Sequence, residues 1–377
     1  MRALLVLRPD ALTHHGGDTV QAHSTASALC AIGLEAHVVA TKSPDPRGFD
    51  IAHIFGMNQP EVCARQIECC RRAGVSVALS PIWLSLREFF ARARAVEAVL
   101  GKARAEKAAR AKLARLRATP AVRLLDRRRH AQLARMEALQ VRLLLAADVL
   151  LPNSAIEARE YVTALGVTCA RVRVVRNAVV DQAYDGTPAA RAGVLCAGRV
   201  ESMKNQAMLA LAVRGLDPSL TLAGEACDSY YLQLCRRWGG SQLQHAGRLA
   251  QPQLFAALRA TQVHAMPSWG ETTGLASLEA AAAGCKLVVG NRGAEIEYFG
   301  DDAEYADPAD PDSIRAAVLR ALGRPPRAAG DSLDRRMRAL SWRRAAEQTA
   351  AAYGWALSGS ASAANPSAGV PPTGGRR

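Results

Sequence analysis

The chain has 377 residues, of which 49% are hydrophobic and 22% charged, and its formal net charge is +14. This length and composition exclude a single small module and a wholly disordered chain, and they provide enough apolar surface for two cores. The positive charge favours anionic partners such as nucleic acid, phospholipid or phosphorylated metabolites. No segment approaches the roughly 18 consecutive apolar residues of a membrane span, so we expect a cytoplasmic protein.

The first half begins with short apolar runs bounded by turn residues, which predict strands. The predicted strands are Ala3–Leu7, His37–Ala40, Ile51–Ile54, Val75–Leu79, Val149–Leu151 and Val172–Val175. Helical stretches such as Val20–Ile32 and Glu61–Arg72 lie between them. Alternation of strands and helices is typical of a parallel sheet covered on both faces.

Residues 86–145 interrupt this alternation with a segment rich in Ala, Arg, Lys and Leu. It holds sixteen Lys and Arg against five acidic residues, so it supplies most of the net charge. Its composition favours helix, and Pro120 divides it into two predicted helices. Three interpretations remain open: solvated helices, a surface for anionic lipid, and a nucleic-acid interface. Phe89 and Phe90 are its only aromatic residues, so nucleic acid is the least favoured partner.

The second half repeats the alternating pattern after a turn-rich junction near residues 178–188. Its predicted strands are Val194–Ala197, Leu220–Ala223, Val263–Met266 and Leu287–Val289, with helices near Gln206–Arg214 and Gln253–Arg259. We therefore expect a first domain at 1–180 and a second at 181–340. A tail of Ser, Ala, Pro and Gly over 358–377 is predicted to be disordered.

The nine cysteines are odd in number and include no Cys-x-x-Cys pair. They are predicted to be reduced thiols, since neither a disulfide framework nor a zinc site fits this spacing. The sequence Asp310-Pro311-Asp312 precedes a helical segment and is interpreted as a helix cap, so no metal site is predicted.

The segment from Pro267 to Gly284 is the most informative in the chain. A polar loop follows the strand Val263–Met266 and leads into an Ala-rich helix, which Thr272 or Thr273 is expected to cap. Free amides near Gly274 and Leu275 would then form an anion pocket. Glu271 and Glu279 flank this pocket at a spacing of eight, about 8–10 Å along the helix axis.

A second group of polar residues follows the strand Val194–Ala197. Arg199 and Lys204 stand in the loop at its carboxyl end, where ligands bind in open parallel sheets. Two cations at this spacing can neutralise a diphosphate.

Together these motifs resemble the family-four retaining glycosyltransferases of the GT-B fold. The resemblance rests on the Glu-x7-Glu segment, the Gly-Arg…Lys loop, an early Gly16-Gly17-Asp18-Thr19 loop, Pro152-Asn153-Ser154 and Arg176-Asn177-Ala178-Val179. It implies an α/β protein with two Rossmann-like, doubly wound domains that face a cleft, the first carrying the basic helical insertion. It also implies that a late helix over residues 341–357 crosses back onto the first domain, where the acceptor binds.

The resemblance further implies a nucleotide-diphosphate sugar as donor substrate and no separate cofactor. Arg199 and Lys204 would grip the diphosphate, and Glu279 would hold the ribose hydroxyls. Glu271 and the backbone of Thr273, Gly274 and Leu275 would hold the sugar, while Gly16 and Gly17 would approach the phosphates, since glycine permits close backbone contact. Catalysis would be retaining and independent of metal.

The sequence also departs from the family. Ser80-Pro81-Ile82-Trp83 lacks the histidine that many members carry after the fourth strand, a role that His14, His15 or His53 could fill. The expected function is sugar transfer to a glycan or lipid-linked acceptor, in cell-envelope polysaccharide synthesis and at the inner face of the membrane. The alternatives are a nucleotide-sugar epimerase of the same fold, or a non-catalytic basic module for membrane or nucleic acid.

Overall fold

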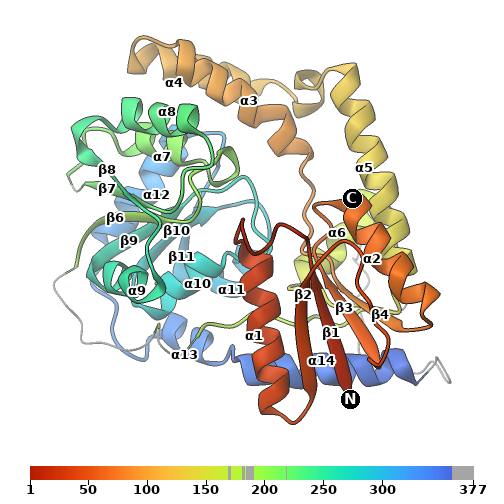
Figure 1. Ribbon diagram of the computed structural model, residues 1–377. Coiled ribbons are helices and arrows are strands. Elements are labelled where there is room, and N and C mark those ends of the chain that lie inside the picture. Colours follow the sequence, from red (N-terminus) through yellow and green to blue (C-terminus); the bar gives the residue numbers. More distant parts are fainter. Residues whose placement is uncertain (169–170, 181–182, 184–190, 218, 359–377) are drawn as a thin grey trace, which may run out of the picture.

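In a computed structural model, the chain forms two parallel β-sheets, each covered by helices on both faces (Figure 1). The structure describes residues 1–168, 171–180, 183, 191–217 and 219–358. The predicted α/β fold class with two parallel-sheet domains is confirmed.

The first domain holds a five-stranded sheet in the order β2-β1-β3-β4-β5. Its strands are β1 (Arg2–Leu7), β2 (Glu35–Ala40), β3 (Ile51–Phe55), β4 (Ser76–Ser80) and β5 (Val149–Leu150). Its helices are α1 (Gly17–Ala31), α2 (Pro60–Arg72), α3 (Arg87–Lys102), α4 (Glu106–Ala118), η1 (Ala121–Leu124), α5 (Arg127–Ala146) and α6 (Ala155–Leu165).

The second domain holds a six-stranded sheet in the order β11-β10-β9-β6-β7-β8. Its strands are β6 (Ala192–Ala197), β7 (Leu220–Ala223), β8 (Leu243–Gly247), β9 (Thr261–Met266), β10 (Lys286–Gly290) and β11 (Ala303–Ala306). Its helical segments are η3 (Ser202–Lys204), α7 (Gln206–Val213), α8 (Ser229–Gly239), η4 (Gly240–Gln242), α9 (Gln251–Ala260), α10 (Leu275–Ala282), α11 (Glu295–Phe299), η5 (Gly300–Asp302), α12 (Pro311–Gly323) and α13 (Ser332–Arg338).

The order of strands reverses between β1 and β3 in the first sheet and between β6 and β9 in the second. The chain therefore leaves β6 and β9 toward opposite faces of the sheet, and a crevice opens outside their carboxyl ends. This topology places the loops after β6 and β9 side by side.

Alternate side chains of each strand enter two cores. In β1, Leu5 and Leu7 face the core under α1, whereas Leu4 and Val6 face the core under α2 and α5. The last helix, α14 (Trp342–Leu357), packs against α1 on the first domain, and its Tyr353 is fully buried there (Figure 1). The chain thus returns to its first domain after completing the second.

Two details of the predicted elements are wrong. Val172–Val175 forms no strand and contributes one bridge, from Val172 to Leu150. The strands β8 and β11 were not predicted, because His245 and Glu304 interrupt their short apolar patterns. The predicted junction at 178–188 and the tail at 358–377 lie mostly outside the described residues.

The basic segment contains three α-helices and the short 3-10 helix η1, where Pro120 alone predicted two helices. The additional break at residues 103–105 has a tertiary cause, because Arg237 of α8 donates to the carbonyls of Gly101 and Ala103 at the end of α3. These carbonyls have no partner inside the helix, so an outside donor stabilises its end. The helix α5 lies on α2 of the first domain, whereas α3 and α4 lie on the second (Figure 1).

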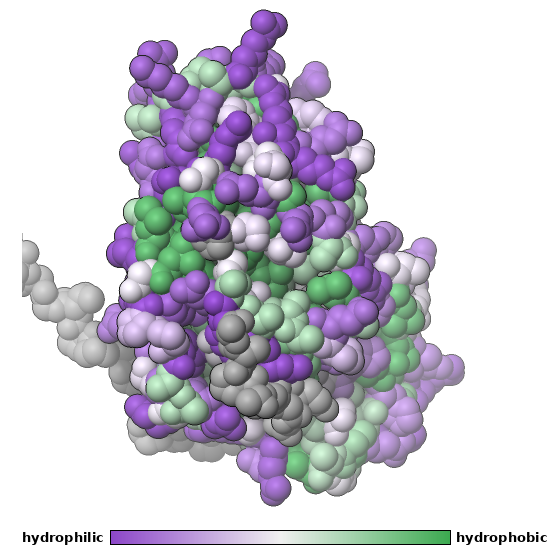
Figure 2. All heavy atoms as spheres, turned by 90° about the vertical axis from the view of Figure 1, so that its left-hand side faces the viewer, coloured by the Kyte–Doolittle hydropathy of each residue, from purple (hydrophilic) through white to green (hydrophobic). Residues whose placement is uncertain are grey.

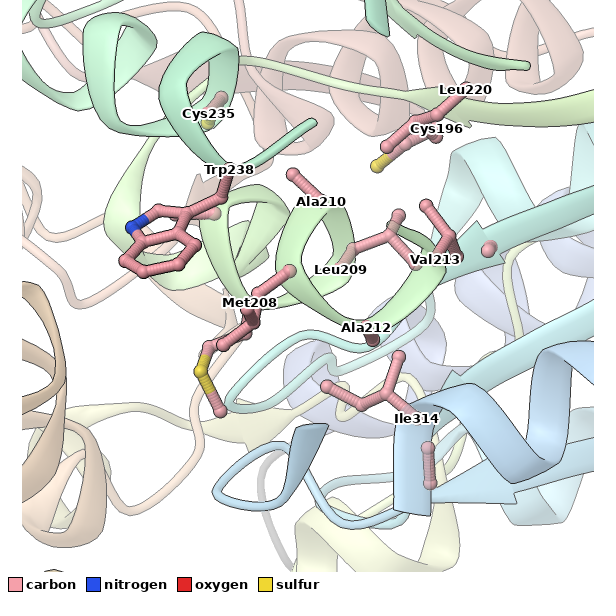
Figure 3. Close-up of a cluster of buried hydrophobic side chains, with 14 of the residues drawn as sticks. Cys196, Met208, Leu209, Ala210, Ala212, Val213, Leu220, Cys235, Trp238 and Ile314 are labelled. Carbon is pink, nitrogen blue, oxygen red and sulfur yellow. The ribbon is translucent and has the colours of Figure 1, made fainter. Parts of the chain in front are cut away.

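Helices α7, α8 and α12 form the core on which α3 and α4 pack. Figure 3 shows Met208 and Leu209 of α7 between Trp238 of α8 and Ile314 of α12. The helix α7 is buried along its whole length, so it has no solvated face. No helix in the described part of the chain is long and apolar enough to cross a membrane.

Candidate functional site

The site lies where the loops after β6 and β9 meet. Lys204, in the η3 turn after β6, donates from Nζ to Glu271 Oε1 at 2.6 Å. Ser268 Oγ donates to the same carboxylate oxygen at 2.8 Å. The contact between Lys204 and Glu271 joins two residues that stand 67 positions apart in the sequence.

Lys204 and Glu271 are largely buried, with side-chain exposures of 20% and 11%. Burial lowers the pKa of the Lys204 ammonium, but the Glu271 carboxylate outweighs this effect, and the pKa stands above its ordinary value. A charged pair in such a setting is held ready for a polar ligand, because solvent has already been removed from it.

Arg199 lies nearer to solvent than Lys204. Its side chain is 45% exposed and its Nη2 donates to Glu201 Oε1 at 3.1 Å. The backbone carbonyl of Arg199 accepts from Gln206 Nε2, which fixes the loop at its start. An exposed guanidinium with one weak partner can turn toward a phosphate at small cost.

The helix α10 begins without a side-chain cap. Its N-cap is Gly274, in the left-handed region at φ +70°, and not Thr272 or Thr273 as predicted. Thr273 is instead buried, with its hydroxyl accepting from Asn177 Nδ2 at 3.1 Å. The first amides of α10 are therefore free of a side-chain acceptor and can bind an anion.

Glu279 lies on α10, one turn beyond its start. Burial raises the pKa of its carboxyl to about 7. Hydrogen bonds donated to this carboxylate by a ligand would favour the charged form and lower this pKa again.

Glu295 is a residue of this site that the sequence did not indicate. It is 1% exposed, and among the described residues no hydrogen bond to either carboxyl oxygen meets the usual geometry, although Ser277 is close enough to act on the carboxyl. A Cβ atom at Gly274 would lie 2.5 Å from its Oε1, so only glycine fits there. Burial, then the charge of Glu271, raises the pKa of Glu295 well above its ordinary range, although the Ser277 hydroxyl opposes this shift.

A chain of amides connects the loop before α10, at Thr273, to the first domain. Gln21 of α1 exchanges hydrogen bonds with Asn153, and its Oε1 accepts from Asn177 Nδ2 at 3.2 Å. Asn177 also bonds to Thr273, while Tyr298 donates to the Asn153 carbonyl at 2.6 Å. The sequence marked Asn153 and Asn177 only as turns, and Gln21 was missed because a single polar residue on a buried helix face carries no periodic signal.

The structure brings the early glycine loop to the same place. A Cβ atom at Gly17 would lie 3.5 Å from Leu275 Cδ1, at the start of α10. One at Gly16 would lie 2.6 Å from Asp18 Oδ1. Gly17 therefore lies against the start of α10 in the other domain, whereas Gly16 lies against Asp18 and Arg8 of its own domain.

The three candidate histidines differ in burial. His53 is buried between Ser80 Oγ at 2.9 Å and Tyr353 OH at 2.8 Å, and burial lowers its pKa to about 3. His14 and His15 are exposed. A buried neutral His53 serves the packing of α14 on the first sheet.

Asp310 caps α12, with its side chain accepting from the Asp312 amide at 3.0 Å, as the sequence indicated. The described residues hold no cluster of three or more His, Cys, Asp or Glu side chains placed to bind a metal ion. Their cysteines are free thiols.

Two parallel-sheet domains with facing strand ends are the GT-B architecture of glycosyltransferases. Sucrose-phosphate synthase from Thermosynechococcus elongatus has a TM-score of 0.68 and 15% identity, over 95% of this chain and 100% of that one. A glycosyltransferase involved in avilamycin A biosynthesis has a TM-score of 0.63 and 17% identity, over 95% and 98%. Anabaena HepE, solved with UDP and glucose, has a TM-score of 0.59 and 12% identity, over 94% and 95%.

Residues 191–324 match the family described as glycosyl transferases group 1. This range holds the Gly-Arg…Lys loop and the Glu-x7-Glu helix, so the resemblance to GT-B glycosyltransferases is confirmed.

Curated relatives agree with this family. The chain is 35% identical to an MMP α-(1→4)-mannosyltransferase of Mycolicibacterium hassiacum over 128 residues, which are 32% of this chain and 31% of that protein. It is 32% identical to glycogen synthase of Mycobacterium tuberculosis over 224 residues, 55% and 54% of the two chains. The chain thus spans between about a third and about half of these relatives.

Proposed function

We propose that this protein is a retaining, metal-independent glycosyltransferase that moves a sugar from a nucleotide-diphosphate donor to a glycan or lipid-linked acceptor. The observation that carries the proposal is the contact between Lys204 and Glu271 at the switch point of the second sheet, beside the uncapped start of α10. The mannosyltransferase and glycogen synthase similarities support sugar transfer, and the UDP in the HepE structure supports a nucleotide donor.

The second domain would bind the donor. Arg199, Lys204 and the first amides of α10 would hold the diphosphate, and these groups would stabilise the negative charge that grows as it leaves. Glu271 would accept hydrogen bonds from the sugar and Glu279 from the ribose. No metal is required in this scheme, because two cations and a helix terminus supply the positive charge.

The first domain would hold the acceptor. A small polar hollow lies at the carboxyl ends of β1 and β3, beside the Gly16-Gly17 loop. Polar residues line it, including Arg8, Asp18, Asn58 and Gln59. Such a lining suits hydroxyl groups, which both donate and accept hydrogen bonds.

The reaction would proceed on one face of the sugar. The bond from the anomeric carbon to the phosphate oxygen breaks, and the acceptor oxygen forms its bond to the same carbon from the same side. The acceptor proton passes to a phosphate oxygen of the leaving diphosphate, so no side-chain base is needed. This scheme agrees with the position of His53, which is held by Ser80 and Tyr353 and is not free to take a proton.

A role at an anionic membrane surface, and with it cell-envelope polysaccharide synthesis, forms a further part of the proposal. Many cations of α4 and α5 are exposed and have no acidic partner among the described residues: Lys107, Lys112, Arg115, Arg127, Arg128, Arg135 and Arg142. Figure 2 shows dense hydrophilic side chains at the end of the molecule that carries α4. A basic surface of this kind is attracted to anionic headgroups.

Thermal unfolding with uridine, guanosine and adenosine diphosphates and their sugars tests the donor. A ligand at about 100 times its dissociation constant adds about 2.7 kcal/mol of stability. We expect one nucleotide series to raise the melting temperature, and Glu271→Ala to reduce the effect of the sugar form more than that of the diphosphate alone. If no nucleotide stabilises the protein, the proposal is wrong.

Incubation of the selected donor with and without acceptor distinguishes transfer from epimerisation. Transfer predicts a glycosylated acceptor with the anomeric configuration of the donor, formed equally well in excess EDTA. An isomerised donor sugar formed without acceptor would indicate the epimerase. Full activity of Lys204→Ala, combined with loss of function on charge reversal within 102–129, would indicate a non-catalytic basic module.

A further inference from the structure

The helices α3 and α4 form an arm, residues 87–118, that belongs to the first domain by sequence and to the second by packing. Val96, Leu100 and Leu113 of the arm join the same hydrophobic core as Met208 and Trp238. Figure 3 shows the latter two side chains, and Figure 1 shows the arm lying over α7 and α8. Burial of several large apolar side chains fixes the arm on the second domain.

Polar contacts support this packing. Trp238 Nε1 donates to the Leu100 carbonyl at 3.2 Å. Arg110 forms an ion pair with Asp312, and Arg117 forms one with Asp310, at the start of α12. The arm therefore moves with the donor domain, although both of its ends connect to the acceptor domain.

One arm residue reaches the turn that carries Lys204. Glu97 of α3 accepts a hydrogen bond from the Ser202 hydroxyl, and Ser202 is the first residue of the η3 turn that ends at Lys204. The next residue, Met203, packs against the hydrophobic core that the arm shares with α7 and α8. Its carbonyl accepts from the Trp269 amide at 3.0 Å. The turn is thus held between α3 on one side and the loop of Glu271 on the other.

The arm also contacts the loop of Glu271 and its support. Leu84, just before the arm, lies 3.2 Å from the position of a Cβ atom at Gly270. Glu88 accepts from Arg292 at 2.7 and 3.1 Å. Arg292 stands two residues before Ala294, whose amide donates to the Glu271 carbonyl at 2.8 Å.

We propose that the arm is a positioning element of the donor site, in which Glu97 fixes Ser202 and thereby the direction in which Lys204 faces a nucleoside diphosphate. This inference rests on the proposed function and identifies a further residue for it. Glu97 does not touch the substrate, and its effect passes through the η3 turn. A first-domain segment thus sets the affinity of the second domain for its ligand.

The surroundings of Lys204 explain why the η3 turn needs to be held in place by Glu97. The ammonium would exchange part of its contact with Glu271 for contact with phosphate, and a mobile turn would lose entropy on binding. A turn already fixed by Glu97 and Trp269 avoids that loss, which is the general benefit of a preorganised site.

A double-mutant cycle in the full chain tests the inference. Glu97→Ala, Ser202→Ala and the double variant are titrated by calorimetry with the nucleoside diphosphate that stabilises the wild type. We expect each single variant to bind about tenfold more weakly, or about 1.4 kcal/mol, and the double variant no more weakly than the singles. The donor KM should rise in the same proportion while kcat changes little.

Two matched variants distinguish positioning from loss of structure. Glu97→Gln keeps an oxygen that accepts from Ser202, so its affinity should stay within about twofold of the wild type. Glu106→Gln removes the charge that pairs with Arg110 and Arg214, away from the loops of Lys204 and Glu271, and should leave affinity unchanged.

The outcomes separate this inference from the proposed function. A wild-type protein that binds no nucleoside diphosphate contradicts the proposed function, and the inference falls with it. A wild-type protein that binds one, with a folded Glu97→Ala that binds it equally well or with additive losses in the cycle, contradicts the inference alone.

Discussion

The two sides of the cleft differ in how their charges are used. On the proposed donor side, Lys204 and Glu271 form a largely buried pair, and Arg199 is half exposed and pairs with Glu201 among the described residues. On the proposed acceptor side, Arg8 is paired with both Asp10 and Asp18 at 2.8 Å.

This difference indicates a division of labour. Free or readily exchanged positive charge belongs where a diphosphate leaves, because it stabilises the charge that develops there. Charges that neutralise one another shape a polar pocket without attracting an anion. Variants on each side should therefore have different consequences.

The largest effect is expected from Lys204→Met. The substitution removes the ammonium that we propose to face the diphosphate, and it leaves Glu271 without its cation. We expect nucleoside-diphosphate affinity to fall about 100-fold, or about 2.7 kcal/mol, measured by calorimetry. The matched acceptor-side variant, Arg8→Met, should change that affinity less than threefold. If the two variants lose equal affinity for the nucleoside diphosphate, the two sides of the cleft do not differ in how they bind an anion.

The next effect concerns the amides that join the two sides. Asn177→Ala removes the amide that donates to Gln21 and to Thr273, so Gln21 Oε1 keeps only its bond from Asn153 and the buried Thr273 hydroxyl loses this donor, at a cost of about 1–3 kcal/mol. We expect a lower melting temperature and, in scanning calorimetry, two resolved transitions where the wild type has one. Thr273→Ser keeps the hydroxyl and serves as the control. A single unshifted transition in Asn177→Ala would show that this contact does not couple the domains.

The sequence marked more candidate site residues on the second domain than on the first, and the reason is physical. Arg199, Lys204, Glu271 and Glu279 follow strands or enter a helix at spacings that local chemistry determines, so a motif records them. The partner of Lys204 could not be read from the spacing, because the contact depends on β6 and β9 being neighbours in the sheet. Glu295 was not predicted for the same reason, since only the fold places it under Gly274.

The basic segment shows the same limit at the level of packing. Its composition predicted helices, and they are present. Composition did not show that Leu100 and Leu113 lie on the second domain while Leu143 lies on the first, because all three belong to similar Ala-rich and Arg-rich sequence. The choice of surface depends on partners such as Trp238 that stand far away in the chain.

A smaller, pH-dependent effect is expected at Glu295. Burial, then the charge of Glu271, raises its pKa in the folded protein, with Ser277 and Lys204 opposing the shift and Tyr305 also nearby. The folded state therefore holds a proton that the unfolded state releases above about pH 4.5, and stability falls by up to about 1.4 kcal/mol per pH unit until the folded pKa is reached.

Glu295→Gln removes this dependence. We expect its melting temperature to equal that of the wild type near pH 5 and to exceed it increasingly toward pH 8, as followed by circular dichroism. If the melting temperatures of the two proteins depend on pH in the same way, Glu295 is ionised in the folded state. The site would then hold a third charged side chain beside Lys204 and Glu271, and not a neutral carboxyl.

The smallest single effect is expected on the outer surface, where acceptor-side α5 and the arm helix α4 both expose cations. Each exposed Lys or Arg near an anionic bilayer contributes about 1 kcal/mol, so Arg128→Gln on α5 and Lys112→Gln on α4 should each weaken binding to phosphatidylserine vesicles about fivefold in flotation assays at low salt. Arg343→Gln on α14, whose guanidinium is already paired with Glu347, is the control and should bind as the wild type does. Binding should decline as salt rises, since screening weakens exposed charges. If only Arg128→Gln weakens vesicle binding, the membrane-binding surface is restricted to α5. If both variants weaken binding equally, the surface extends over the arm. Binding to neutral vesicles as strong as to anionic ones would exclude an electrostatic role for either helix.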